Sequence, residues 1–160
     1  MPTFLAVARF EPFRGVRYDP DRVALADVTA PPYDVLSDAD RDRLAARHPN
    51  NIVRIDVPME RHGPGRYDAA AATLERWLDE GVLVVEEEPS LYLERMRFTD
   101  EAGTEHTTVG VLGALEVVDS GDGDVLPHEQ TTPKAKTDRL ELTRATSANL
   151  SAVWVLSLAR

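Results

Sequence analysis

The stretch RYDAAAATLERWLDEG, residues 66–81, sets the framework of the fold. Its apolar side chains recur at intervals of three and four residues, which is the spacing of one face of an α-helix. They are Tyr67, Ala70, Ala71, Leu74, Trp77 and Leu78. Pro64 or Gly65 opens the pattern, and Gly81 closes it at the position where helices often end in a left-handed glycine. We therefore predict a helix whose apolar stripe belongs to a hydrophobic core and not to a cofactor site.

A shorter helix is predicted before this one. The hydroxyl of Ser37 can cap its first turn, which contains two aspartates, and Leu44 falls on its buried face. The helix should stop near residues 48–49, where His is followed by Pro. Between the two helices, residues 51–57 alternate apolar and polar side chains, which is typical of a half-buried strand.

The N-terminal third is otherwise expected to be extended or irregular. Residues 4–9 are predicted as a strand and residues 11–23 as an irregular stretch punctuated by proline and glycine. In the segment 27–37, Pro31 and Pro32 force an extended path and remove two backbone donors.

The C-terminal half favours strands. Residues 82–85 are predicted as a short strand, after which three glutamates form a solvated corner. Two β-rich runs, 90–99 and 105–118, flank the turn Asp-Glu-Ala-Gly, which is a good hairpin signal. The chain should then end in a loop, a helix over about 137–146 and an apolar strand over 152–158.

These elements predict an α+β fold. Its expected parts are a mixed β-sheet, two or three helices on one side, a long central hairpin and the loop-helix-strand unit. At 160 residues the chain has the size of a single domain, residues 1–160, with a mixed α/β segment over 1–85 and the hairpin and final unit over 86–160.

Composition limits the classes of partner. The formal net charge is −10, and residues 58–126 alone carry 16 acidic and 5 basic side chains. Proteins that bind duplex nucleic acid need clustered Lys and Arg, and this chain has only two lysines. We expect no nucleic-acid partner, although one or two cations suffice for a single phosphate or a small anion.

The chain has no cysteine, so disulfides, thiolate metal sites and a cysteine nucleophile are excluded. Its N-terminus shows no signal-peptide pattern, and its apolar runs are far shorter than the roughly 18 residues of a membrane span. We therefore expect a cytoplasmic protein without a membrane-crossing segment.

No metal site is predicted. The acids of residues 119–124 alternate as in a calcium loop, but the twelfth position counted from Asp119 is Gln130 where an EF-hand needs glutamate. His48, His62 and His106 lack the spacing of metal ligands, so we read them as exposed or locally satisfied.

The loop 127–132 is the best candidate for chemistry. It contains His128, Glu129 and the hydroxyl of Thr131, and a helix start with Lys136 and Arg139 follows it. Loops on a rigid scaffold position reactive groups, and a helix N-terminus offers N–H groups to an anion. A capped loop with ordinary surface charges is the alternative that these residues leave open.

Four segments in order carry a family resemblance. FEPFRGVRYDP, DVTAPPYDVLS, HPNNIVR and VLPHEQTTPKAKTDRLELTRATSANLS resemble the signature segments of the prokaryotic family called domain of unknown function 1015. Members of that family are usually more than twice as long, and their second half carries an Asp-Gly-His-His-Arg element similar to the phosphate-binding segment of ParB/sulfiredoxin-fold kinases. The resemblance therefore implies the N-terminal portion of a longer protein, or a short relative.

A finer similarity concerns Leu126-Pro127-His128-Glu129. The free-serine kinases of the ParB/sulfiredoxin fold place such a loop before a helix and a strand, and their glutamate takes the proton of the serine hydroxyl. The resemblance implies that Glu129 is the base, beside His128.

The same resemblance suggests substrate- or phosphate-binding residues on two walls. Thr131, Lys136 and Arg139 lie on one side, and Arg14 or Arg17 with Tyr18 would line the other. Tyr33 is also a candidate binding residue, although prolines fix its loop and favour a structural role for its ring. We expect His128, Glu129, Lys136 and Arg139 to converge on one face of the loop-helix junction, near at least one of Arg14, Arg17 and Tyr33.

Two functions follow as hypotheses. The first is the substrate side of a serine-kinase-like phosphotransferase that acts on a small hydroxyl compound. The second is a non-catalytic binding or assembly module. In the first case ATP or ADP with magnesium would serve a full-length protein, whereas this chain by itself carries no cofactor and should not bind nucleotide tightly. The apolar C-terminal run could also mediate self-association.

Overall fold

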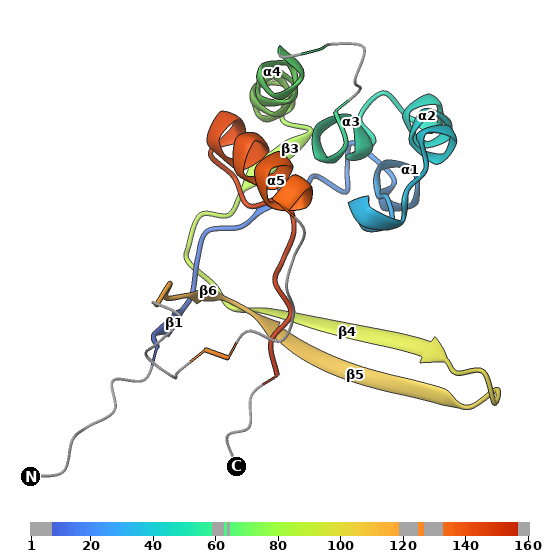
Figure 1. Cartoon of the computed structure of the whole chain (residues 1–160), viewed down its shortest axis with the longest axis vertical. Coiled ribbons are helices and arrows are strands. Elements are labelled where there is room, and N and C mark those ends of the chain that lie inside the picture. Colours follow the sequence, from blue (N-terminus) through green and yellow to red (C-terminus); the bar gives the residue numbers. More distant parts are fainter. Residues whose placement is uncertain (1–7, 59–62, 64, 119–124, 127–132, 157–160) are drawn as a thin grey trace, which may run out of the picture. The chain divides into compact units, whose positions relative to one another are not determined.

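The computed structural model describes residues 8–58, 63, 65–118, 125–126 and 133–156. The chain divides into two compact units (Figure 1). We call residues 1–15 with 86–130 the hairpin unit, and residues 16–85 with 131–160 the helical unit. Residues 131–160 thus belong to the same unit as residues 16–85.

The helical unit contains most of the helices. In chain order its elements are β2 (Val16–Tyr18), α1 (Leu25–Val28), the 3-10 turn η1 (Tyr33–Val35), α2 (Asp38–Arg47), α3 (Val53–Asp56), α4 (Arg66–Asp79), β3 (Leu83–Val85) and α5 (Pro133–Thr146). β2 and β3 pair in antiparallel fashion, so that Val16 faces Val85 and Tyr18 faces Leu83. β2 lies inside the stretch 11–23, which the sequence predicted as irregular throughout.

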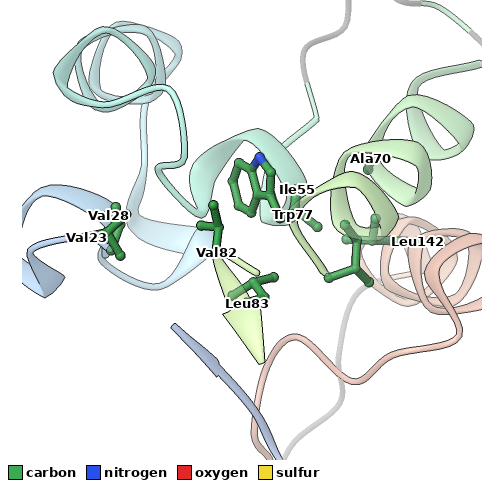
Figure 2. Close-up of a cluster of buried hydrophobic side chains, with 9 residues drawn as sticks. Val23, Val28, Ile55, Ala70, Trp77, Val82, Leu83 and Leu142 are labelled. Carbon is green, nitrogen blue, oxygen red and sulfur yellow. The ribbon is translucent and has the colours of Figure 1, made fainter. Parts of the chain in front are cut away.

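The central helix α4 is confirmed. Gly65 is its N-cap, and Gly81 follows its end with φ of +69°, a backbone conformation that disfavours other residues. Figure 2 shows Trp77 in a cluster contributed by α3, α4, β3 and α5. Trp77 and Ile55 are 0% exposed and Leu142 of α5 is 2% exposed. α5 therefore closes the core that α4 begins.

The helix α2 is also confirmed, with its predicted cap. The Ser37 hydroxyl accepts a hydrogen bond from the backbone N–H of Asp40, and the Asp40 carboxylate accepts one from the backbone N–H of Ser37. This reciprocal pair satisfies backbone donors that would otherwise lack partners. Leu44 is buried and the helix ends before His48, as the sequence indicated.

The strand predicted over 51–57 is wrong, because the helical turn α3 occupies its centre. Asn51 is fully buried, and its side-chain oxygen accepts the backbone N–H of Val53. The Asn51 amide donates to the carbonyls of Asp27 and Thr29, so this residue ties the start of α3 to the end of α1. These tertiary contacts override the alternating pattern, which Val53 and Ile55 satisfy equally well in a buried turn.

The hairpin unit contains β1 (Phe10–Glu11), β4 (Tyr92–Thr99), β5 (Glu105–Leu112) and β6 (Ala114–Leu115). β4 and β5 form the predicted hairpin, in which Tyr92 faces Leu112 and Thr99 faces Glu105. Gly103, with φ of +82°, occupies the turn. β1 pairs with β6, so the described strands form three antiparallel pairs and not one mixed sheet.

The C-terminal part departs from expectation in two places. α5 begins at Pro133, one turn earlier than predicted, which suits a proline at the first helical position. Residues 152–156 are exposed and belong to no strand, so the predicted strand is wrong for them. Residues 157–158 of that prediction, the turn 119–124 and most of the predicted strand 4–9 lie outside the described residues, and residues 8–9 are not in a strand.

The α+β class is confirmed by five α-helices and the antiparallel strand pairs of the described residues. This is more than the two or three helices expected, because α1 and α3 are single turns that periodicity does not reveal. Within the described residues, every helix is too short or too polar to cross a membrane.

Candidate functional site

A polar cluster lies where α5 meets the rest of the helical unit. We call it the Arg139 clamp, and its members are Tyr33, Asp56, Arg66, Tyr67, Asp138 and Arg139. They come from η1, the end of α3, the first turn of α4 and the second turn of α5. Its Asp56–Arg139 pair joins residues that lie 83 positions apart in the sequence.

All three guanidinium nitrogens of Arg139 donate hydrogen bonds. Nη1 donates to Oδ1 of Asp56 at 2.7 Å, and Nη2 donates to the backbone oxygen of Asp56 at 2.8 Å. Nε and Nη2 both donate to Oδ2 of Asp138, at 3.2 and 2.8 Å. The flat guanidinium group also lies over the ring of Tyr33, with its Cζ atom 4.0 Å from the ring centroid. Hydrogen bonds thereby hold the edge of the Arg139 guanidinium group, and the Tyr33 ring covers its face.

The other carboxylate oxygen of Asp138 binds α4. Oδ1 accepts the Tyr67 hydroxyl at 2.8 Å and Nη2 of Arg66 at 3.3 Å. The same Arg66 nitrogen donates to the Tyr67 hydroxyl at 2.6 Å, and the Arg66 guanidinium lies 4.5 Å from the Tyr67 ring centroid. Asp138 thus ties α5 to α4 through Oδ1 and holds the neighbouring Arg139 through Oδ2.

The charges of the clamp balance, with two carboxylates against two guanidinium groups. Burial raises the pKa of Asp56, and the nearby Arg139 only partly opposes this effect. Burial acts in the same direction on Asp138, but the hydrogen bonds from Arg139, Tyr67 and Arg66 outweigh it, so the pKa of Asp138 is lowered. Burial and the bond to Asp138 raise the pKa of the Tyr67 hydroxyl.

This geometry makes Arg139 a positioning group. Its donors are directed at protein acceptors and its face is covered by Tyr33, so it is poorly placed to take a substrate phosphate directly. The clamp holds the second turn of α5, where Arg139 lies ten residues after Glu129 in the sequence (139 − 129).

Comparison with known proteins agrees with the ordered segments seen in the sequence. The family model DUF1015, described as a protein of unknown function, matches residues 10–159. The chain belongs to this family. No curated protein and no solved structure matches the chain.

The remaining predicted site residues of this DUF1015 chain fall into two groups. Nε of Arg14 donates to the backbone oxygen of Glu86 at 2.8 Å, within the hairpin unit. Arg17 and Tyr18 lie in β2 of the helical unit, where an Arg17 nitrogen contacts the Tyr18 carbonyl at 3.3 Å. The Tyr18 hydroxyl donates to the backbone oxygen of Asn50 at 2.7 Å, and burial raises its pKa. Tyr18 therefore serves the core, packed beside Trp77.

The catalytic candidates themselves are not part of the described chain. His128, Glu129 and Thr131 lie outside the described residues, and Lys136 belongs to α5 although its side chain is outside the description. The structure brings Arg139 to Tyr33, one of the three contacts considered for it, while the meeting with Glu129 stays a prediction. Among the described residues, no group of three or more His, Asp or Glu side chains is arranged to hold a metal ion.

Sequence reasoning missed the acidic and aromatic partners in the clamp. Asp56 falls inside the predicted strand 51–57, and Tyr67 belongs to the apolar stripe of the predicted helix that begins beside Arg66. One signal was available, because Asp56 lies between the apolar residues Ile55 and Val57, and a carboxylate buried there needs a cation. The identity of that cation depends on tertiary folding.

Proposed function

We propose that this chain supplies the substrate-binding side of a phosphotransferase that acts on a small hydroxyl compound. Support comes first from Leu126–Glu129, which resembles the Leu-Pro-His-Glu loop of free-serine kinases with the ParB/sulfiredoxin fold. The observation that carries the proposal is the Arg139 clamp, which anchors the helix after this loop onto Tyr33 and Asp56. A catalytic loop needs such a rigid support to hold its groups in position.

The proposed roles follow from the chemistry of phosphoryl transfer. Glu129 accepts the proton of the substrate hydroxyl. The hydroxyl oxygen then forms a bond to the transferred phosphorus, and the bond from that phosphorus to the nucleotide oxygen breaks. His128 and Thr131 lie beside this base in sequence, and Lys136 offers a cation to a substrate carboxylate. The donor, ATP or ADP with magnesium, would be held by a phosphate-binding segment outside this sequence, because the chain has no Gly-rich phosphate loop.

One observation favours the alternative, a non-catalytic binding or assembly module. Arg139 is neutralised by Asp56 and Asp138, so the best-placed cation of the clamp is already used. In that case the family fold would serve recognition alone. The two functions differ in whether the loop 126–132 responds to small hydroxyl compounds.

Binding to this loop can be measured by NMR. We expect L-serine, L-threonine or glycerol to shift the amide signals of residues 126–139, and Lys136→Gln to weaken the amino-acid interaction by roughly tenfold through the lost charged hydrogen bond. Lys134→Gln is the matched control, because it removes the other lysine of the same segment. Unchanged signals at residues 126–139 with all three compounds would contradict the phosphotransferase proposal.

We further propose that the chain self-associates through its C-terminal run. Four adjacent apolar side chains are exposed there: Val153 (84%), Trp154 (60%), Val155 (56%) and Leu156 (92%). Because their contact with water is unfavourable, burial against a second copy of the chain is favoured. Sedimentation velocity should show a concentration-dependent increase in mass that Trp154→Asp abolishes. Val117→Asp is the control, since Val117 is 97% exposed but lies in the hairpin unit. A monomer at every concentration tested would refute this interface.

A further inference from the structure

A groove separate from the Arg139 clamp lies in the helical unit. It has a volume of about 510 Å³ and runs between α2 and the segment that links α1 to α2. Pro31, Val35 and Leu36 line it from the linking segment, whereas Arg43, Leu44 and Arg47 line it from α2. This volume is in the range of small-molecule sites, about 300–1,000 Å³.

The two arginines lie four residues apart, on the same side of α2. Arg43 is paired with Asp40, whose carboxylate accepts its Nη2 at 2.7 Å and also accepts the Ser37 hydroxyl at 2.6 Å. These contacts help hold the pKa of Asp40 low, so this carboxylate is ionised and offsets Arg43.

Arg47 is in a different situation. Its Nη1 atom donates to the backbone oxygen of Ala26 at 3.3 Å, which is a neutral acceptor. Among the described residues it forms no ion pair with a carboxylate. With Asp40 offsetting Arg43, the lining of the groove keeps one positive charge, in a chain whose formal net charge is −10.

The remaining lining is largely apolar. Val35 is 66% exposed beside the half-buried Leu36, and Leu44 forms part of the opposite wall. A ligand that matches this lining presents one negative charge to Arg47 and an apolar body to Val35 and Leu36. A guanidinium group binds a carboxylate through two parallel hydrogen bonds, which also fixes the orientation of the ligand.

We infer that this groove binds a small organic monocarboxylate with an apolar body. The single uncompensated charge selects a monoanion over the dianionic form of phosphate. The inference does not depend on the phosphotransferase proposal, because the residues involved belong to α2 and the linking segment and not to residues 126–139.

The test uses hexanoate as the probe in an NMR titration of the whole chain. We expect shifts at residues 29–47 and a loss of affinity of at least roughly tenfold in Arg47→Gln, as for a lost charged hydrogen bond. Arg76→Gln is the matched control, since Arg76 is an exposed arginine on α4 outside the groove. Hexanol, which has the same body without the charge, should bind at least tenfold more weakly than hexanoate.

A second variant guards against an indirect effect of removing Arg47. Val35→Glu places a carboxylate at an exposed position of the groove, so it should repel hexanoate while the circular dichroism spectrum stays unchanged. The inference is overturned if hexanoate fails to bind at about 10 mM, if hexanol binds equally well, or if inorganic phosphate binds in preference. Wild-type affinity in both Arg47→Gln and Val35→Glu would also overturn it.

Discussion

Replacing Arg139 with leucine is expected to lower the free energy of unfolding by about 3 kcal/mol at neutral pH, because it leaves a largely buried Asp56 carboxylate without its cation. Arg144→Leu is the control on the same helix. Its partner Glu141 is 44% exposed and Arg144 itself is 66% exposed, so that surface pair should contribute less than about 1 kcal/mol. Urea unfolding measures both values.

The loss in Arg139→Leu should shrink as the pH falls. Without Arg139, burial raises the folded-state pKa of Asp56 further above its unfolded value. The folded state then takes up a proton first, so the variant recovers stability as the pH falls through that folded pKa, and the recovery is complete below the unfolded pKa.

Asp138 contributes in the same sense. Its pKa is lowered in the folded wild-type protein, so the stability that it provides is present above its unfolded pKa and is lost as the pH falls through the folded pKa. The difference between wild type and Arg139→Leu should therefore be smaller near about pH 4 than at neutral pH. Equal losses in Arg139→Leu and Arg144→Leu at both pH values would show that the clamp does not anchor α5.

Replacing Trp77 with alanine is expected to have the largest effect of any core change, about 3–5 kcal/mol. Trp77 is 0% exposed and stands in the cluster that joins α3, α4, β3 and α5. Trp154→Ala is the control, because Trp154 is 60% exposed and its loss should change stability by less than about 0.5 kcal/mol in dilute solution.

The two tryptophans also provide an independent readout. At concentrations where the chain is monomeric, iodide should quench the fluorescence of Trp154 and leave that of Trp77 unaffected. The sequence contains only these two tryptophans. The single-tryptophan variants Trp77→Phe and Trp154→Phe separate the signals. A Trp77 that iodide quenches as easily as Trp154 would contradict the buried position shown in Figure 2.

The parts of the fold that sequence could predict are those that local patterns specify. α4 has an apolar stripe and a closing glycine, α2 has its serine cap, and the β4–β5 hairpin has a glycine in its turn. Each signal is contained within about 16 residues and arises from backbone geometry. These elements were therefore correctly assigned before any tertiary contact was known.

The errors share one physical cause. The alternation around Val53 and Ile55 favours a strand, but the buried Asn51 side chain binds backbone groups more than 20 residues away and stabilises a helical turn. Likewise, the apolar run 152–156 was assigned to a strand although it forms no strand pairing in the structure. Both outcomes depend on what the segment meets in space, which a local pattern does not contain.

In the candidate site, too, local patterns indicate some of the residues, and tertiary contacts decide the rest. The sequence predicts that the group containing Arg139 lies near Arg14, Arg17 or Tyr33, and in the structure Arg139 contacts Tyr33. The partners that decide what Arg139 does, Asp56 and Asp138, were not named as site residues, because the ion pair to Asp56 spans 83 residues. Residue type indicated the polar character of the region, whereas only the fold shows which charges cancel.

The position of Leu142 in the Trp77 cluster has a consequence for synthesis on the ribosome. Leu142 is made 65 residues after Trp77 (142 − 77), which takes roughly 3–13 s at typical rates of translation. During this interval α4 can form and Val82 and Leu83 can reach Trp77, but the face that α5 covers stays open to water. For several seconds the nascent chain therefore exposes an apolar helix face that can aggregate with other chains. A chaperone that shields such faces would raise the folding yield of this protein.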